Sequence, residues 1–200
     1  DTSPSLVVFS RDLTEGGAAF GRLSFADRVG DGLPSSARRL AVTQTHVYVT
    51  GSGDPVGEPD NTADLISIFQ RSSTTGVPAH DVNLTVEVPQ EAGPIVVDAA
   101  RSLAFVASAA NGSVSMYSVD PAQAALPAGR LSLLGTAASS PAAPAVDLAL
   151  APDAPQLYLS VAGATALRRF GYDGLAPSLA FRRGDELQAG IADPGTGGNA

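Results

Sequence analysis

The sequence predicts an all-β protein built from short antiparallel strands. Glycine (21 residues) and proline (15) are spread along the 200-residue chain, which disfavours long helices because helix interiors tolerate neither residue well. Short β-branched and aromatic segments end repeatedly at Gly, Pro, Asn or Asp, as strands do. These segments recur with a period of about fifty residues, four to a period, which indicates β-propeller blades. The alternative is a β-sandwich or barrel of about thirteen strands.

Aromatic residues mark two strand types within each repeat. The first type ends in an aromatic residue, at Phe9, Phe69, Tyr117 and Phe170. The second type carries an aromatic residue in its middle, at Tyr48, Phe105 and Tyr158. The second type precedes the first by 12 residues in the last two repeats and by 21 in the earliest, where residues 52–64 form an insertion rich in Gly, Pro and Asp. The regular spacing makes these segments a repeat.

Two further strands complete each unit. One directly precedes the Tyr48-type strand, at residues 38–42, 94–97 and 146–150. The other opens the unit, at residues 21–25, 83–88, 129–134 and 178–181. If the opening strand is innermost, the chain contains one orphan outer strand, three complete four-stranded units and one further inner strand. The expected units are 21–73, 83–120 and 129–173, in a repeat region of 1–186 followed by a flexible tail or linker at 187–200.

The pattern resembles the YVTN-type, lactonase-like β-propeller repeat family. The matching segments are 6–12, 46–54, 111–113 and 151–160. The resemblance implies the fold but not the activity, since this repeat occurs in proteins of many functions. Closed propellers have four to eight blades, and three units do not make a ring. We therefore expect another copy, or the remainder of a longer chain, to complete the propeller.

Composition narrows the classes of partner and compartment. The formal net charge of −8 disfavours nucleic-acid binding, and no apolar run is long enough for membrane insertion. The absence of cysteine excludes disulfides, thiolate metal sites and cysteine nucleophiles. Because the chain starts without methionine, we expect a processed bacterial protein that is exported to an extracellular, periplasmic or cell-surface location.

The acidic insertion carries the candidate metal ligands. Asp54, Glu58, Asp60 and Asp64 could supply oxygen ligands to calcium, although their spacing is not that of an EF-hand. A solvated loop is the preferred interpretation. No other cofactor is expected.

Histidines and the remaining aspartates offer no catalytic constellation. His46 and His80 are expected at the surface or in turns, in no metal-ligand spacing. Asp98, Asp147 and Asp153 are expected to stabilise turns, or to line a propeller axis.

These observations favour a non-catalytic interaction or scaffold module that binds a protein or glycan through its propeller loops. Catalytic residues are not identified, and whether the protein is an enzyme is left open. The first alternative is a lactonase-like hydrolase or isomerase with an acidic site at the propeller axis. The second is a calcium-dependent adhesion module.

Overall fold

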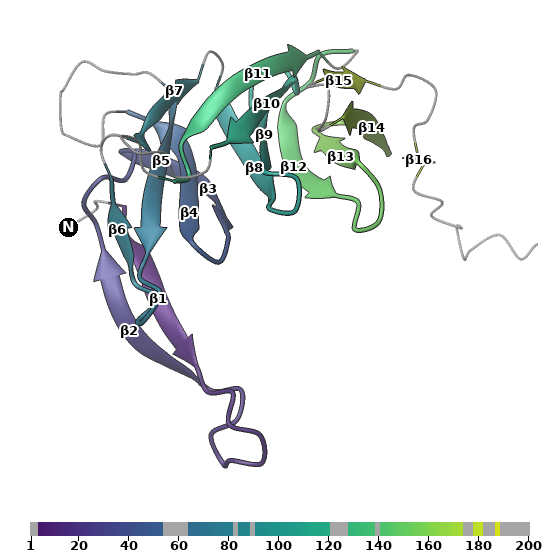
Figure 1. Cartoon of the computed structure of the whole chain (residues 1–200). Coiled ribbons are helices and arrows are strands. Elements are labelled where there is room, and N and C mark those ends of the chain that lie inside the picture. Colours follow the sequence, from purple (N-terminus) through teal and green to yellow (C-terminus); the bar gives the residue numbers. More distant parts are fainter. Residues whose placement is uncertain are drawn as a thin grey trace, which may run out of the picture.

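A computed structural model describes residues 4–53, 64–81, 84–88, 91–120, 128–138, 141–173, 178–181 and 187–188. Regular structure within these ranges consists of sixteen β-strands (Figure 1). None of the described residues belongs to a helix that is long and apolar enough to cross a membrane.

Most of these strands form three antiparallel sheets in chain order. The first contains β3 (Ser36–Val42), β4 (His46–Ser52), β5 (Asp64–Arg71), β6 (Pro78–His80) and β7 (Val86–Val88). The second contains β8 (Ala92–Asp98), β9 (Leu103–Ser108), β10 (Val114–Val119) and β11 (Leu131–Ala137). The third contains β12 (Ala145–Leu150), β13 (Gln156–Val161), β14 (Ala166–Asp173), β15 (Ser178–Phe181) and β16 (Leu187–Gln188). In the first and third sheets, two short strands share the outer edge.

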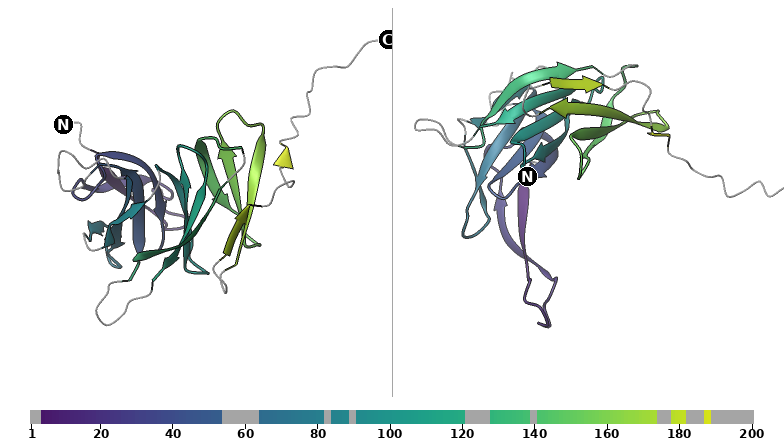
Figure 2. Two further views of the ribbon diagram at one scale, coloured as in Figure 1. Left: turned by 90° about the horizontal axis from the view of Figure 1, so that it is seen from above. Right: turned by 45° about the vertical axis from the view of Figure 1, so that its right-hand side comes forward.

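The three sheets lie side by side, in the order in which they follow one another along the chain (Figure 2). Strand β8 contacts both β3 and β12, so these three strands are the inner members of their sheets. Each inner strand is followed by a short turn to the second strand of its sheet. This arrangement confirms the predicted all-β, propeller-like class.

Apolar side chains fill the space between neighbouring sheets. Both faces of a middle strand are covered, so β9 and most of β5 are buried continuously along their length. One core cluster joins the first and second sheets around Tyr48, Ile66 and Tyr117. A second joins the second and third sheets around Phe105, Leu148 and Phe170. Burial of these large side chains stabilises the stacking of the sheets.

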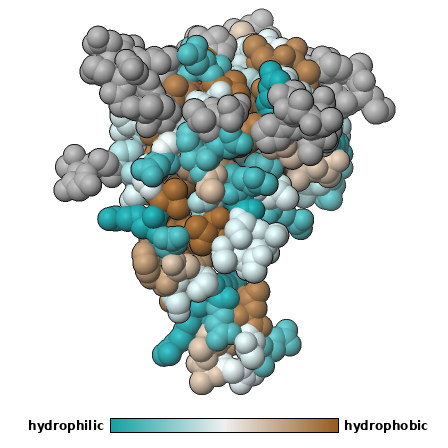
Figure 3. Space-filling model, turned by 60° about the vertical axis from the view of Figure 1, so that its left-hand side comes forward, coloured by the Kyte–Doolittle hydropathy of each residue, from teal (hydrophilic) through white to brown (hydrophobic). Residues whose placement is uncertain are grey.

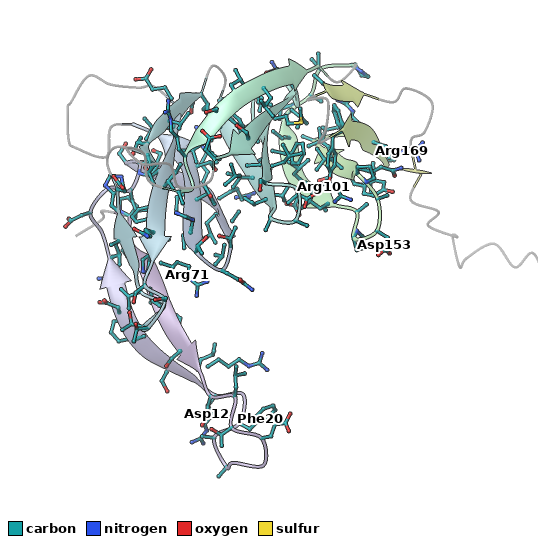
Figure 4. The ribbon with its side chains drawn as sticks, viewed as in Figure 1. Asp12, Phe20, Arg71, Arg101, Asp153 and Arg169 are labelled. Atoms are coloured by element: carbon teal, nitrogen blue, oxygen red, sulfur yellow. The ribbon has the colours of Figure 1, made fainter. Side chains whose placement is uncertain are left out.

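A two-stranded hairpin precedes the three sheets. It consists of β1 (Leu6–Arg11) and β2 (Leu23–Val29), and it projects away from the rest of the molecule (Figure 1). Its base packs on the first sheet, where Leu6 and Val29 contact a buried cluster that includes Val49. The tip carries Asp12 and Phe20, and Arg71 lies where the hairpin leaves the body (Figure 4).

The grouping of strands into sheets differs from the predicted one by one strand. The segment that was expected to open each unit is hydrogen-bonded as the outermost strand of the preceding sheet, as β2 and β11 show. The observed sheets therefore span 36–88, 92–137 and 145–188, in place of 21–73, 83–120 and 129–173. Sequence periodicity fixes the order of strands, but it does not say which four of them share hydrogen bonds. Leu187–Gln188, expected in the tail, pairs with β14, and residues 189–200 lie outside the described residues.

Candidate functional site

The inner strands of all three sheets begin with the same irregularity. A β-bulge interrupts the pairing with the second strand between Ala37 and Arg39, between Ala92 and Ile95, and between Ala145 and Asp147. Bulges re-aim the side chain of the extra residue, and they are common beside binding sites. In the first sheet that extra residue is Arg38.

Arg38 meets two carboxylates at this edge. Its Nη1 lies 2.8 Å from Glu91 Oε1 and 3.8 Å from Asp64 Oδ1, and it donates to the carbonyl oxygen of Ala92 at 3.2 Å. We call Arg38, Asp64 and Glu91 the inner-edge cluster. Strands β3 and β5 run parallel to each other, so both begin at the same edge, and Glu91 directly precedes β8. The topology therefore brings together residues that are far apart in the sequence.

The inner-edge cluster combines a fixed positive charge with carboxylate oxygens that differ in exposure. Glu91 is the more exposed carboxylate, whereas Asp64 is largely buried and its Oδ1 has no hydrogen-bond partner among the described residues. A guanidinium can polarise a carbonyl oxygen and stabilise the negative charge that develops on it. A neighbouring carboxylate can accept a proton from water. The cluster thus holds a group that can stabilise an oxyanion and a group that can act as a general base.

A cavity of about 530 Å³ lies between the first and second sheets at the opposite edge. It is lined by the β3–β4 turn, the β8–β9 turn, His46, Val119 and Gly129. The register of β13 with β14 matches that of β9 with β10, so Tyr172 of the third sheet occupies the position of Val119. The larger tyrosine fills the corresponding space between the second and third sheets, and the smaller valine leaves the cavity open.

The two histidines lie in different surroundings from those expected. His46 is buried at the start of β4, so its expected surface position is wrong, and its Nε2 has no hydrogen-bond partner by geometry among the described residues. Burial lowers the pKa of His46, against a smaller opposing effect of the Ala128 backbone. His80 is half-buried in β6, with its ring 5.2 Å from that of Phe69. Burial lowers the pKa of His80 as well.

Asp98, Asp147 and Asp153 do not converge on one site. Asp98 ends β8 at the edge away from the inner-edge cluster, where Oδ2 accepts hydrogen bonds from Tyr172 Oη at 2.7 Å and from Arg101 Nη1 at 2.8 Å. Its Oδ1 accepts from the Arg101 amide, which is the turn-stabilising role predicted from the sequence. Asp147 Oδ1 accepts from the Leu148 amide, and Asp153 is exposed in a turn at the edge of the molecule (Figure 4).

The calcium candidates are only partly described. Asp54, Glu58 and Asp60 lie outside the described residues, and Asp64 belongs to the inner-edge cluster. In the described part of the chain, no three His, Asp or Glu side chains are grouped as a metal site would require. Calcium binding by the insertion stays a prediction.

Comparison with known proteins supports the fold. No protein-family model and no curated protein matches the sequence. The periplasmic gluconolactonase of Pseudomonas aeruginosa is 16% identical with a TM-score of 0.56, and the match covers 88% of this chain and 50% of that one. Candidate 6-phosphogluconolactonases of Bacteroides uniformis and Bacteroides fragilis are 17% and 13% identical, with TM-scores of 0.52 and 0.51. Those matches cover 90% and 88% of this chain, and 64% and 63% of the solved chains.

The chain has a β-propeller-like fold and spans about half to two thirds of the length of these structures. Identities this low show the fold alone. The names of the matching structures favour the hydrolase alternative over a non-catalytic interaction or scaffold module, and they correct that leading interpretation of the sequence.

Sequence reasoning missed the inner-edge cluster. Arg38 was expected only as part of the strand at residues 38–42, Asp64 only as a calcium candidate, and Glu91 was not singled out. Two signals could have found the cluster: Arg38 and Glu91 stand at the starts of equivalent strands, and such starts share one edge of the fold. The β-bulge that redirects Arg38 has no recognisable sequence signature.

Proposed function

We propose that the chain belongs to an exported bacterial hydrolase that opens the ring of a sugar-acid lactone at the inner-edge cluster. The observation that carries the proposal is the Arg38 guanidinium held 2.8 Å from Glu91 and 3.8 Å from Asp64, where β3, β5 and β8 begin. The likeness to gluconolactonases, one of them periplasmic, supports the substrate class and the compartment. It also supports assigning the repeat to the YVTN type.

In the proposed reaction a water molecule adds to the lactone carbonyl carbon while Glu91 accepts its proton. Arg38 stabilises the negative charge on the carbonyl oxygen. The ring C–O bond then breaks, the protonated Glu91 returns the proton to the leaving alkoxide, and the product is the open hydroxy acid. Asp64 also helps to keep Arg38 in position, because its Oδ1 lies 3.8 Å from the same Nη1 atom.

The test is the rate of δ-gluconolactone hydrolysis, corrected for the spontaneous reaction. Removing a general base costs about 100-fold or more in rate, and we expect a loss of this size for Glu91→Gln. Arg38→Lys keeps the charge but not the planar fork, and we expect it to lower kcat more than it raises KM.

Two control variants locate the activity. Glu15→Gln removes a carboxylate from the exposed β1–β2 turn and should leave the rate unchanged. Val119→Tyr should fill the cavity beside His46, as Tyr172 fills the equivalent space, and should also leave the rate unchanged. Loss of activity in Val119→Tyr with full activity in Glu91→Gln would move the site to the cavity and contradict the proposal.

A further inference from the structure

The β1–β2 hairpin repeats the outer half of the second sheet residue for residue. Every Cα pair of β1 with β2, from Leu6↔Val29 to Arg11↔Leu23, has its counterpart 108 positions later in β10 with β11, from Val114↔Ala137 to Val119↔Leu131. The register shift also falls at the same place, after Val8 and after Met116. The hairpin is therefore the outer pair of a blade.

The turns that follow match as well. The Asp12 amide donates to Arg22 O and the Gly21 amide to Asp12 O, and the same two bonds join Asp120 with Arg130 and Gly129. Gly21 and Gly129 both have positive φ, at 80° and 91°. Such agreement in backbone conformation shows that the hairpin is folded as in a four-stranded sheet, although it pairs with no further strand among the described residues.

In the second sheet the inner edge of β10 is occupied by β9. Residues Val114–Ser118 of β10 pair with Leu103–Ala107 of β9, which in turn pairs with β8. The corresponding edge of β1, from Leu6 to Ser10, pairs with no strand among the described residues. An open edge of this kind accepts an added strand through backbone hydrogen bonds.

The apolar face beside this edge is uncovered in the same way. Leu40 of β3 has the register position that Leu148 holds in β12, since each pairs with the same position of the second strand. Leu148 is 5% exposed in the core with Leu103 and Phe105 of β9, whereas Leu40 is 53% exposed. Val42, at the position of Leu150, is 56% exposed.

Two grooves mark the space left open. One of about 390 Å³ runs between Leu6 and Leu40, and the other, of about 260 Å³, runs along β1 from Leu6 to Phe9 toward Val42. Exposed apolar side chains lie on β1, β2 and β3, and apolar patches are visible on the narrow end of the molecule that the β1–β2 hairpin forms (Figure 3). The grooves lie where β9 packs in the equivalent blade.

We propose that the open edge of β1 and the exposed face of β3 bind an inner β-hairpin of the same repeat, with the chemistry of β8–β9. Its second strand pairs antiparallel with Leu6–Ser10, and its apolar side chains cover Leu40 and Val42. A second copy of the chain is a poorer occupant, because every inner pair among the described residues already lies in a sheet of its own. The docked hairpin would complete a fourth blade.

The chain itself supplies the probe for a test. Because Leu6 corresponds to Val114, residues 91–113 placed directly before Leu6 would supply the missing inner pair with its natural turn. The control carries the same residues in shuffled order. The readout is a single thiol, since the chain has no cysteine: Leu40→Cys for the proposed face, and Leu133→Cys, at a site 51% exposed in β11, for a surface that should not change.

We expect the extended chain with Leu40→Cys to be labelled about tenfold more slowly than its shuffled control, since thiol reactivity follows exposure. Labelling of the Leu133→Cys chains should not differ. The midpoint of thermal unfolding should rise in the extended chain only. Equal labelling of the two Leu40→Cys chains would overturn the proposal.

Two further measurements keep the test decisive. Should an extended chain not fold, the free peptide 91–108 added to the Leu40→Cys chain gives the same readout. The Leu40→Cys chain is also labelled without extension or peptide at rising protein concentration. If its thiol becomes protected, a second copy is the occupant, and the proposal is overturned.

Discussion

The Tyr172 hydroxyl donates to Asp98 Oδ2 at 2.7 Å and so joins the third sheet to the second. Burial raises the pKa of the Tyr172 hydroxyl to about 12, so it remains a hydrogen-bond donor at any ordinary pH. Burial alone would also raise the pKa of Asp98, but hydrogen bonds from Tyr172 and Arg101 outweigh it and hold that pKa below its ordinary value of 3.8. Asp98 therefore stabilises the fold above its unfolded pKa, and this contribution is lost as the pH falls through the lowered folded value.

Tyr172→Phe tests this contact. It leaves a buried carboxylate oxygen with one donor fewer, and the free energy of unfolding at pH 7 should fall by about 1–3 kcal/mol. The loss should narrow as the pH falls through the lowered pKa of Asp98, because the protonated carboxyl depends less on the donor. Tyr158→Phe removes a hydroxyl that donates to Gln156 at 3.3 Å and is the matched control, with a smaller effect.

Denaturant unfolding at several pH values measures both variants. A Tyr172→Phe loss that stays constant down to about pH 2, where most carboxyl groups are protonated, would contradict the linkage.

Prediction from sequence succeeded at this scale where one residue acts on its own turn, and failed where residues meet across sheets. Asp98 was expected to bind backbone amides nearby, and it does. Its bond to Tyr172 spans 74 positions, and the pairing of Arg38 with Glu91 depends equally on how two sheets stack. No spacing in the sequence encodes either contact.

At the scale of the element, the start of β8 is closely packed against its neighbours. Gly93 lies at the bulge, where a Cβ would come within 2.7 Å of the Ala107 carbonyl oxygen. Thr50 Oγ1 also donates to the Gly93 carbonyl oxygen at 2.7 Å, which joins the first sheet to the second beside the inner-edge cluster. The backbone here can shift little without breaking that contact.

Gly93→Ala should therefore destabilise the protein by about 1–3 kcal/mol, the usual cost of overpacking a filled site. Gly135→Ala in β11 is the control, because a Cβ at Gly135 meets no atom within 4 Å. Thermal unfolding of the two variants beside the wild type measures the difference. Equal midpoints for both variants would show that the bulge in β8 is not close-packed.

The strands themselves were largely predictable, because each carries its own pattern of apolar and aromatic residues. What failed was the assignment of strands to sheets. The segment expected to open the first unit forms β2, the strand that follows β1. Its sequence suits an inner strand as well as an outer one. Only its pairing with β1 decides the matter. Hydrogen bonds between strands of similar composition leave no trace in the periodicity.

At the scale of the whole molecule, the described residues form three sheets side by side, with the β1–β2 hairpin packed on the first. The position of the inner strands fixes two distinct edges: one carries the inner-edge cluster, and the other carries the cavity beside His46. We assign the proposed chemistry to the edge that carries the inner-edge cluster. We assign no catalytic step to the edge that carries the cavity.

Calcium bound by the acidic insertion would stabilise the folded chain as a whole. An ion that binds only the folded chain raises the midpoint of thermal unfolding, so the midpoint should be higher in calcium than in chelator. Equal midpoints in the two conditions would exclude the insertion as a calcium site.

Binding of D-gluconate, the product of the proposed reaction, locates the site most directly. The measurement is the change in backbone amide chemical shifts as gluconate is added to the isotope-labelled chain. We predict that the shifts move at Arg38, Asp64 and the Glu91–Gly93 segment, and that Glu91→Gln weakens the response. Shifts confined to His46, Val119 and Gly129 would contradict the inner-edge site and place binding in the cavity.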